Sequence, residues 1–539
     1  MKSYYGKCVF SGIAMGPVCL IKQGNHAIKK YTVENIEDEM QRFLEAKAVA
    51  VEQLEILYQK AQREIGEEEA LIFDAHQMML NDLDFLEGIS NMISQNKVNA
   101  EFAVSETGKN IAEIFSGMDD DYMKARATDI LDVSQRVISI MSGSQTQVLQ
   151  MTEPVIIIAE DLTPSETIQF DKQKVLAFVT KKGSANSHTA ILARMMNVPY
   201  LIAGDIELLS ELNNMQAIVD SEEGILLLEP DAATALTYGS KQEALLKKRS
   251  SQLALKGMAS ATKSGRKVKL YANIGGPDDL DMALSNDTEG IGLFRSEFLY
   301  MGRSDYPSEE EQFQAYQKVI QGMKGKPVII RTLDIGADKQ ADYFEIPQEE
   351  NPAMGFRAIR ICLERVQIFK AQLRAIYRAS AFGTTAIMFP MIISLEEIIK
   401  IKEIVVEVKE ELLAEGISFG QVELGIMIET PAAVMVSDEL AREVDFFSIG
   451  TNDLTQYTLA IDRQNQSLEN YYNPHHKALL RMIEMTVNNA HDAGIWCGIC
   501  GELAADMEIT EQLLCLGVDE LSVSPVFILP LRERIRAID

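Results

Sequence analysis

The chain has 539 residues, of which 47% are hydrophobic and 24% are charged, a balance typical of globular proteins. This length exceeds what one hydrophobic core normally organises and predicts about three domains. The net charge of -29 disfavours binding to nucleic acid or to anionic membranes, because phosphate-rich partners select basic surfaces. A macromolecular partner should therefore present basic residues.

Membrane insertion and secretion are not expected. No apolar run reaches the roughly 18 to 20 residues that would span a bilayer, and the first residues lack the charged-then-apolar pattern of a secretory signal. The six cysteines are sparse and irregularly spaced, which argues against a disulfide framework. We therefore expect a protein of the reducing cytoplasm.

The stretch 23–142 has the pattern of a helical bundle. It lacks proline, and apolar residues recur every three to four positions, for example from Val33 onward. Breaks near Gly66, at 96–98 and at 117–119 predict about four helices. An acidic concentration in this stretch is of a kind that ordinarily marks only the solvated end of a helix. Its residues are Glu67, Glu68, Glu69, Asp82, Asp84 and Glu87.

Residues 1–22 and 143–230 bracket this bundle and alternate short apolar runs with helix-like pieces. This pattern predicts one α/β domain into which the bundle is inserted. A charged, helix-prone stretch at 231–260 follows and predicts a linker helix. The apolar runs that we expect to form strands after the bundle are 154–159, 175–179, 216–220 and 224–228.

Residues 261–539 alternate short apolar runs with longer helical segments. Eight such repeats predict a (β/α)₈ barrel of the TIM type, and an open, doubly wound sheet is the alternative. The expected strands are 267–274, 290–294, 327–332, 384–391, 422–428, 445–449, 494–499 and 519–523.

Polar residues follow most of these strands. The βα loops at the carboxyl ends of barrel strands form the active-site face in essentially every characterised case. Arg295, Arg331 and Glu429 end the second, third and fifth strands, while Arg357 and Arg463 lie in nearby loops. So many polar groups at corresponding positions indicate one site. The other polar residues at these strand ends are Asp334, Asn452, Asp453, Cys500 and Glu502.

These residue types predict the chemistry of the site. Arginines supply planar forks that match carboxylate and phosphate oxygens, so the substrate is expected to be a small, multiply charged anion. Glu429 and Asp453 offer two hard oxygen ligands and leave the other positions to substrate and water, which favours Mg²⁺ over zinc. Such a metal would neutralise the anion and polarise an enolate oxygen.

Cys497 and Cys500 form a C-x-x-C motif. A redox pair or half of a zinc site are the alternative interpretations, but the chain has no second C-x-x-C and this one ends a strand. A single thiol over the substrate, with a pKa near the working range, is instead a candidate proton donor to carbon. Cys500 is the better placed of the two.

Of the six histidines, only His188 has a supporting motif. A Gly/Ser/Asn loop precedes it and an Ala-rich amphipathic helix follows, which Asn186 or Ser187 can cap. A neutral imidazole at that position is a nucleophile, and the helix dipole and free backbone N–H groups would stabilise a phosphoryl group on it. By spacing alone, an ordinary surface or satisfied core histidine remains the alternative.

Together these residues resemble the phosphoenolpyruvate-protein phosphotransferase family, enzyme I of the bacterial sugar phosphotransferase system, over nearly the whole chain. The motifs that carry the resemblance are Asp161-Leu-Thr-Pro-Ser-Glu-Thr167, Ser187-His-Thr-Ala-Ile-Leu-Ala-Arg194, Gly290-Ile-Gly-Leu-Phe-Arg-Ser-Glu-Phe-Leu-Tyr-Met301, Ile330-Arg-Thr-Leu-Asp-Ile-Gly-Ala-Asp-Lys339, Glu429-Thr-Pro-Ala432, Gly450-Thr-Asn-Asp-Leu454 and Cys500-Gly-Glu-Leu503.

The resemblance implies roles for individual residues. His188 would carry the phosphoryl group on a ring nitrogen, with Thr167 as a hydrogen-bond partner, and Cys500 would protonate the enolate to pyruvate. Glu429 and Asp453 would bind Mg²⁺. The residues that would hold phosphoenolpyruvate are Arg295, Arg331, Arg357, Asn452 and Arg463.

The resemblance also implies partners and a swivelling α/β domain. The helical insertion would bind the phosphocarrier protein HPr, which makes the acidic concentration a docking site, and the barrel would form a homodimer. Family members usually extend beyond the equivalent of Asp539, so the helix after the eighth strand is expected to be curtailed.

Two rival functions are considered. Phosphoenolpyruvate synthase and pyruvate phosphate dikinase share the phosphohistidine and barrel modules, but they need an additional nucleotide-binding domain for which this chain has no room. A regulatory binder that senses phosphoenolpyruvate is the alternative from a different class, and the full set of site residues argues against it.

Overall fold

The computed structural model organises the chain into two units, 1–247 and 248–539. The loop before His188, at 184–187, lies outside the described residues, so the prediction for it stays a prediction. The same holds for the side chains of 63–64, 67–71, 121–125, 188, 191 and 194–195. The described residues are 1–21, 28–64, 67–117, 121–143, 153–168, 170–171, 173–183, 188–196, 198–301, 303–336, 342–347, 349–463, 465, 468 and 471–539.

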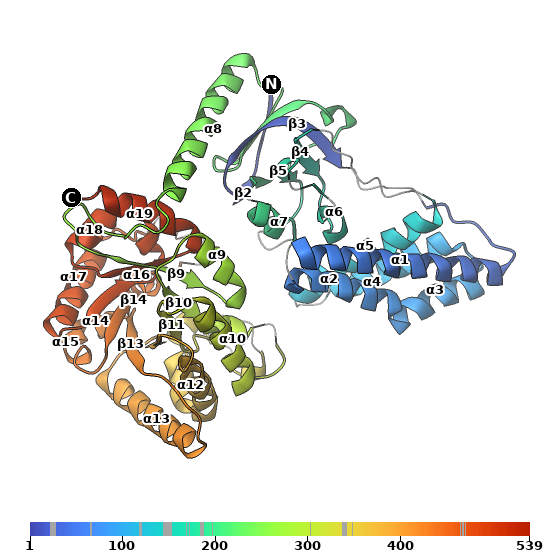
Figure 1. Ribbon diagram of the computed structural model, residues 1–539. Helices are drawn as coiled ribbons and strands as arrows, with labels where there is room; N and C mark the ends of the chain where they lie inside the picture. The colour runs from blue at the N-terminus through green and yellow to red at the C-terminus, as the bar shows by residue number, and fades with distance from the viewer. Residues whose placement is uncertain are drawn as a thin grey trace. The chain divides into compact units, whose positions relative to one another are not determined.

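Five helices pack side by side within the described part of the insertion, where the sequence predicts about four (Figure 1). The additional break lies at Asp82, whose carboxylate accepts hydrogen bonds from the N–H groups of Asp84 and Phe85 and so caps a new helix. Their apolar stripes meet in a core around Phe43, Phe85 and Val104. The helices are α1 (Ile36–Glu64), α2 (Glu67–Asn81), α3 (Leu83–Asn96), α4 (Ala100–Ser116) and α5 (Asp121–Met141).

The bundle is inserted between two neighbouring strands of a mixed sheet. Strands β3 (Ile13–Ile21) and β4 (Val155–Ala159) pair in parallel, although the whole bundle separates them in sequence. The strand order is β1-β8-β7-β3-β4-β5-β6-β2. The other strands are β1 (Lys2–Tyr5), β2 (Lys7–Phe10), β5 (Val175–Thr180), β6 (Tyr200–Ile202), β7 (Gln216–Asp220) and β8 (Ile225–Leu228), with helices α6 (Pro164–Thr167) and α7 (His188–Met196).

The second unit is a closed barrel of parallel strands, which confirms the predicted (β/α)₈ fold and rules out the open sheet. All eight predicted strand segments form strands, and helices surround them (Figure 1). The strands are β9 (Lys269–Ile274), β10 (Ile291–Arg295), β11 (Val328–Arg331), β12 (Thr385–Phe389), β13 (Val422–Ile428), β14 (Phe446–Ile449), β15 (Trp496–Ile499) and β16 (Glu520–Val523).

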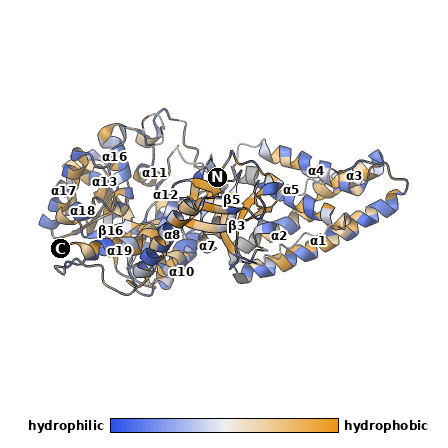
Figure 2. Cartoon of the chain, turned by 90° about the horizontal axis from the view of Figure 1, so that it is seen from above, coloured by the Kyte–Doolittle hydropathy of each residue, from blue (hydrophilic) through white to orange (hydrophobic). Residues whose placement is uncertain are grey.

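Two apolar layers hold the barrel. One large core fills the space between the strands and the surrounding helices, and a smaller cluster around Leu293, Met427 and Phe446 fills the barrel interior. Figure 2 shows the apolar strands inside helices of mixed hydropathy. The main helices are α9 (Leu280–Ser285), α10 (Glu309–Gly322), α11 (Ile359–Glu364), α12 (Val366–Ser380), α13 (Leu395–Ala414), α14 (Pro431–Met435), α15 (Ser437–Leu440), α16 (Thr451–Leu459), α17 (Lys477–Asp492), α18 (Thr510–Cys515) and α19 (Ile528–Ala537).

Helix α8 (Ala232–Leu253) occupies the stretch predicted as a linker helix, and Gln252 is its only buried residue. None of the helices within the described residues combines the length and the apolar character needed to cross a membrane.

A buried arginine anchors the segment after α8 to the barrel. The Arg532 side chain is fully buried, pairs with the Asp287 carboxylate, and donates to the Leu255 carbonyl at 3.2 Å and the Ser260 hydroxyl at 3.1 Å. Gly257 N–H donates to the same Asp287 carboxylate at 2.7 Å. One guanidinium therefore joins α19 to the chain that enters the first barrel strand.

We predict that Arg532→Met lowers the free energy of unfolding of the barrel by about 3 kcal/mol, because it leaves the Asp287 carboxylate and several backbone groups without their partner. Arg536→Met, on the exposed side of the same helix, is the control and should change it by less than about 0.5 kcal/mol. Chemical denaturation followed by circular dichroism measures both, and equal losses would contradict the anchoring role.

Candidate active site

Two buried arginines at the carboxyl end of the barrel share one carboxylate. Arg331 Nη1 lies 3.0 Å from Asp334 Oδ2, and Arg357 Nη2 lies 2.8 Å from Asp334 Oδ1. Glu297 Oε1 holds Arg331 Nη2 from the other side at 2.5 Å. Burial opposes the charged guanidinium, but the carboxylates outweigh it and raise the pKa of both arginines. The two forks are therefore fixed cations before any substrate binds.

Glu429 and Asp453 lie next to these arginines. Glu429 is 1% exposed, and its Oε1 accepts from the Met391 N–H at 2.6 Å, while Oε2 is buried and has no hydrogen-bond partner within the described residues. Burial and the charges of Asp453 and Asp334 raise the pKa of Glu429 to about 8. Gly450 makes room for it, because a Cβ there would lie 2.6 Å from Glu429 Oε2.

The orphaned Glu429 oxygen and the Asp453 carboxylate, which lies 4.0 Å from Arg357 Nη1, are hard oxygen ligands of the type that a divalent cation prefers. The residues present therefore fit Mg²⁺. No cluster of three or more histidine, cysteine or carboxylate ligands occurs in the described part of the chain.

The other predicted binding residues are Arg295, Asn452 and Arg463, and each has contacts of its own. Arg295 is exposed and stacks on Phe298 with its guanidinium carbon 5.1 Å from the ring centroid. The Asn452 amide is paired with Glu502, donating to its carboxylate at 3.1 Å and accepting from its N–H at 2.9 Å. Arg463 lies in an exposed segment, and its backbone N–H donates to Gln456. The described contacts bring together Arg331, Arg357, Glu429 and Asp453 but not Arg463.

Cys497 and Cys500 lie on opposite sides of the seventh strand. Cys497 packs in the core between strands and helices, while Cys500 belongs to the interior cluster, as expected for residues three apart on an extended chain. A shared disulfide or zinc site is therefore excluded. Burial raises the pKa of Cys500 to about 12, well above the expected working range, so the thiol is neutral and keeps its proton at physiological pH.

In the other unit, α7 begins at His188, as predicted. Thr189, the next residue, donates to the Leu162 carbonyl at 3.5 Å, which places the start of α7 beside α6. Thr163 caps α6 in a reciprocal arrangement with Glu166, and the buried Thr167 hydroxyl donates to the Pro164 carbonyl at 2.9 Å. The predicted pairing of Thr167 with the His188 ring lies outside the described side chains.

Three residues that sequence reasoning left without a role support the site. Glu297 and Asp334 orient the arginines, and the Tyr457 hydroxyl accepts from Arg357 Nη1 at 3.5 Å. Both carboxylates stand within or beside the motifs around the strand ends, which was the available signal. Nothing in the local sequence around Tyr457 indicated its contact.

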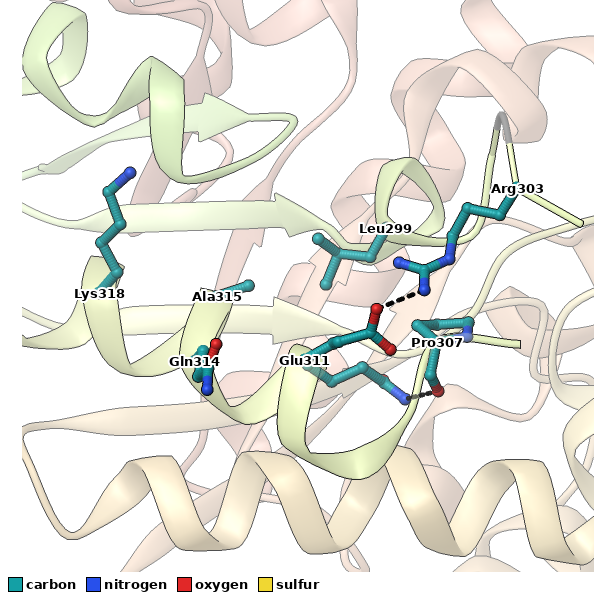
Figure 3. Close-up of a pocket in the computed structure, with 8 residues that line it drawn as sticks. Leu299, Arg303, Pro307, Glu311, Gln314, Ala315 and Lys318 are labelled. Carbon is teal, nitrogen blue, oxygen red and sulfur yellow. Dashed lines mark hydrogen bonds and ion pairs between the residues drawn. The ribbon is translucent and has the colours of Figure 1, made fainter. Parts of the chain in front are cut away.

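A shallow depression of about 320 Å³ lies elsewhere on the barrel (Figure 3). Leu299, Arg303 and residues of α10 line it, and Glu311 neutralises Arg303 at 2.5 Å. None of the predicted site residues lines this depression.

Comparison with known proteins agrees with this arrangement. Three family descriptions match: "PEP-utilising enzyme, N-terminal" over residues 5–126, "PEP-utilising enzyme, mobile domain" over 151–224 and "PEP-utilising enzyme, PEP-binding domain" over 249–539. The fold and these matches thus define a PEP-utilising enzyme.

Named relatives narrow this class. The phosphoenolpyruvate-protein phosphotransferase of Geobacillus stearothermophilus is 44% identical over 99% of this chain and 93% of its own length. Its counterpart from Bacillus subtilis is 42% identical over 99% of this chain and 94% of its own length. An NMR structure of Enzyme I covers 45% of this chain and 99% of its own, with 35% identity and a TM-score of 0.40. The chain belongs to the phosphoenolpyruvate-protein phosphotransferase family.

We predict that Cys500 resists alkylation. A thiol with a pKa near 12 is about a thousandfold less ionised at pH 8 than a thiol of ordinary pKa, and only the thiolate reacts. Iodoacetamide at pH 8 should therefore modify the exposed Cys515 long before Cys500, as followed by peptide mass spectrometry. Equal rates would contradict the buried, neutral thiol.

Proposed function

We propose that the chain transfers the phosphoryl group of phosphoenolpyruvate to its own His188 and then to a histidine of HPr, releasing pyruvate, as the first step of sugar uptake by the phosphotransferase system. The observation that carries the proposal is the fixed pair of arginines, Arg331 and Arg357, beside the under-neutralised carboxylates of Glu429 and Asp453. That arrangement suits a small trianion bound together with a divalent cation.

Each barrel residue then has a role. Arg331 and Arg357, with Arg295, Asn452 and Arg463 around them, hold the carboxylate and phosphate of phosphoenolpyruvate in line with the incoming imidazole. When bound by Glu429 and Asp453, Mg²⁺ would supply positive charge against the phosphate and the enolate oxygen. Cys500 enters the reaction as a neutral thiol and gives its proton to the enolate carbon.

The proposed division of labour follows the chain. Residues 1–22 and 143–230 present His188, with Thr167 as the partner of its ring, and residues 23–142 receive HPr. Residues 231–260 act as the linker on which the His188 domain swings between HPr and the barrel, 261–539, which also forms the homodimer. The cytoplasmic location predicted from cysteine usage is part of this proposal.

The docking of HPr rests on charge. The chain carries 80 acidic and 51 basic residues, and the helical insertion contributes the acidic residues Asp82, Asp84 and Glu87. Asp82 is already engaged as a helix cap, so Asp84 and Glu87 are the better candidates for pairing with a basic partner.

We predict that His188→Ala abolishes the transfer of a radioactive phosphoryl group from phosphoenolpyruvate to the protein, because the only proposed acceptor is lost. His475→Ala, which removes another histidine, is the control and should be labelled normally. The label should be labile in acid and stable in base. Labelling of His188→Ala would contradict the proposed transfer through His188. Labelling of the unmodified protein by ATP alone would favour a dikinase-like enzyme.

We predict that Glu429→Gln weakens Mg²⁺ at least about tenfold, because the amide keeps the shape of the side chain but removes a ligand charge. Glu423→Gln, at the opposite end of the same strand β13, is the matched control for charge and should bind Mg²⁺ normally. Isothermal titration with Mg²⁺ in the presence of phosphoenolpyruvate measures both variants. Equal affinities would remove Glu429 from the metal site.

A further inference from the structure

Three polar side chains, those of Asn273, Ser522 and Glu520, form a column inside the barrel next to Cys500. Asn273 on β9 donates its side-chain amide to two carbonyl oxygens, those of Cys500 and Ser522, each at 3.1 Å. Its Oδ1 accepts from the Ser522 hydroxyl at 2.5 Å. Because both amide hydrogens are directed at acceptors that cannot donate, the network itself determines the orientation of the amide.

This contact replaces a missing strand–strand bond. The pairing of β15 with β16 ends at Ile499 opposite Leu521, so the carbonyl of Cys500, one residue further on, lies beyond the ladder. On its other side, the Cys500 N–H donates to the Ile449 carbonyl at 3.2 Å. The Asn273 amide therefore completes the hold on the Cys500 backbone. Since the thiol is separated from that backbone by one rotatable bond, fixing the backbone restricts where the thiol points.

Glu520 lies at the foot of the column. It is 1% exposed, and a Cβ on Gly292 or Gly498 would come within 2.4 Å or 2.0 Å of its carboxyl oxygens, so only glycines leave room for it. Within the described residues its Oε1 has no hydrogen-bond partner. The neighbouring Ser522 hydroxyl has one proton, which is committed to Asn273, and cannot supply a second donor.

The neutral acid is the form of Glu520 that fits this site, because no described group donates a hydrogen bond to its buried Oε1. Burial raises the pKa of Glu520 to about 8, and Lys269 opposes that shift. Lys269 is itself partly buried, with Nζ 3.9 Å from the centre of the Trp496 ring, and its pKa is lowered. Glu520 therefore stays protonated below about pH 8.

The other titratable groups that act electrostatically with Glu520 do not supply a second cation. Tyr271 shares β9 with Lys269, and Cys497 and Cys500 come from β15; burial raises the pKa of all three, so they are neutral at the same pH. On β13, the carboxylate of Glu423 faces the same end of the barrel. It acts on Lys269 and Tyr271 and adds no positive charge near Glu520.

We propose that Asn273, held by Ser522, is a positioning residue that fixes the side of the enolate from which Cys500 delivers its proton. The proposal rests on the proposed role of Cys500. In that step the S–H bond breaks, the electron pair of the enolate forms the new C–H bond of the pyruvate methyl group, and the thiolate recovers a proton from water.

The hydrogen bonds between Ser522 and Asn273 are expected to depend on pH. When pH rises through about 8, Glu520 ionises and becomes an acceptor that competes for the single proton of Ser522. Asn273 Oδ1 then loses its donor, and the hold on Cys500 weakens. Protonation of the enolate should therefore become slower above this pH. Phosphoryl transfer to His188 should not change, because it does not involve Asn273, Ser522 or Glu520.

The test measures phosphoryl transfer to His188 and protonation of the enolate separately in Asn273→Ala. It uses the full-length protein with Mg²⁺ and HPr. Phosphoenolpyruvate that carries deuterium in one position at C3 reacts in tritiated water, and the handedness of the pyruvate methyl group is determined. We expect labelling of His188 as in the unmodified protein, pyruvate formation slowed roughly ten- to a hundredfold, and a mixed methyl configuration. Ile329→Val, a packing change in the same interior cluster, should keep a single configuration.

Two further variants keep the test decisive. Glu520→Gln cannot ionise and so cannot gain a charge that competes for the Ser522 proton; it should keep a single methyl configuration and lose the decline above pH 8. Ser522→Ala should mix the configuration as Asn273→Ala does, and it replaces that variant if Asn273→Ala does not fold. A single configuration in Asn273→Ala, or an unchanged alkaline decline in Glu520→Gln, would overturn the proposal. Absence of His188 labelling in the unmodified protein would instead overturn the proposed function.

Discussion

Charge buried at the carboxyl end of the barrel must be neutralised from within, and the site is arranged by that requirement. Arg331 and Arg357 supply two positive charges, whereas Glu297, Asp334, Asp453 and Glu429 offer four carboxylates. The two guanidinium groups neutralise the carboxylates nearest to them. The charge of Glu429 is then neutralised by a proton or by a bound cation. Fixed cations beside a carboxylate oxygen that has no hydrogen-bond partner among the described residues are complementary to an anion that binds together with a divalent metal.

Close backbone approach makes this arrangement possible. Gly450 leaves space for the Glu429 carboxylate. A Cβ on Gly501 would lie 2.1 Å from Thr451 Oγ1, so the backbone after the seventh strand packs directly against a side chain that follows the sixth strand. The same device recurs lower in the barrel, where Gly292 and Gly498 enclose Glu520. A filled interior of this kind excludes water, which is why the thiol of Cys500 remains protonated.

The chemistry is divided between two units of the chain. His188 begins helix α7 beside the tightly capped turn of α6, while the arginines and carboxylates belong to the barrel. Neither part is sufficient: the imidazole alone has no phosphoryl donor, and the barrel pocket alone has no nucleophile among the residues that form it. The proposed relay therefore requires domain motion, and we propose the exposed helix α8 as the linker that allows it.

The amino-acid sequence was enough to predict the eight strands of the barrel, the helical insertion, the start of α7 at His188 and most of the polar residues at the strand ends. These features depend on periodicity, capping and position along a strand, which are local properties of the chain. Sequence reasoning counted one helix too few, because the cap at Asp82 interrupts an apolar pattern that continues through it. Only the folded structure shows that Arg331 and Arg357 share Asp334, that Cys497 and Cys500 face apart, and that Ser522 contacts Asn273 across 249 residues. Such contacts arise when the barrel closes and are encoded by shape and burial over the whole fold, so no local pattern could reveal them.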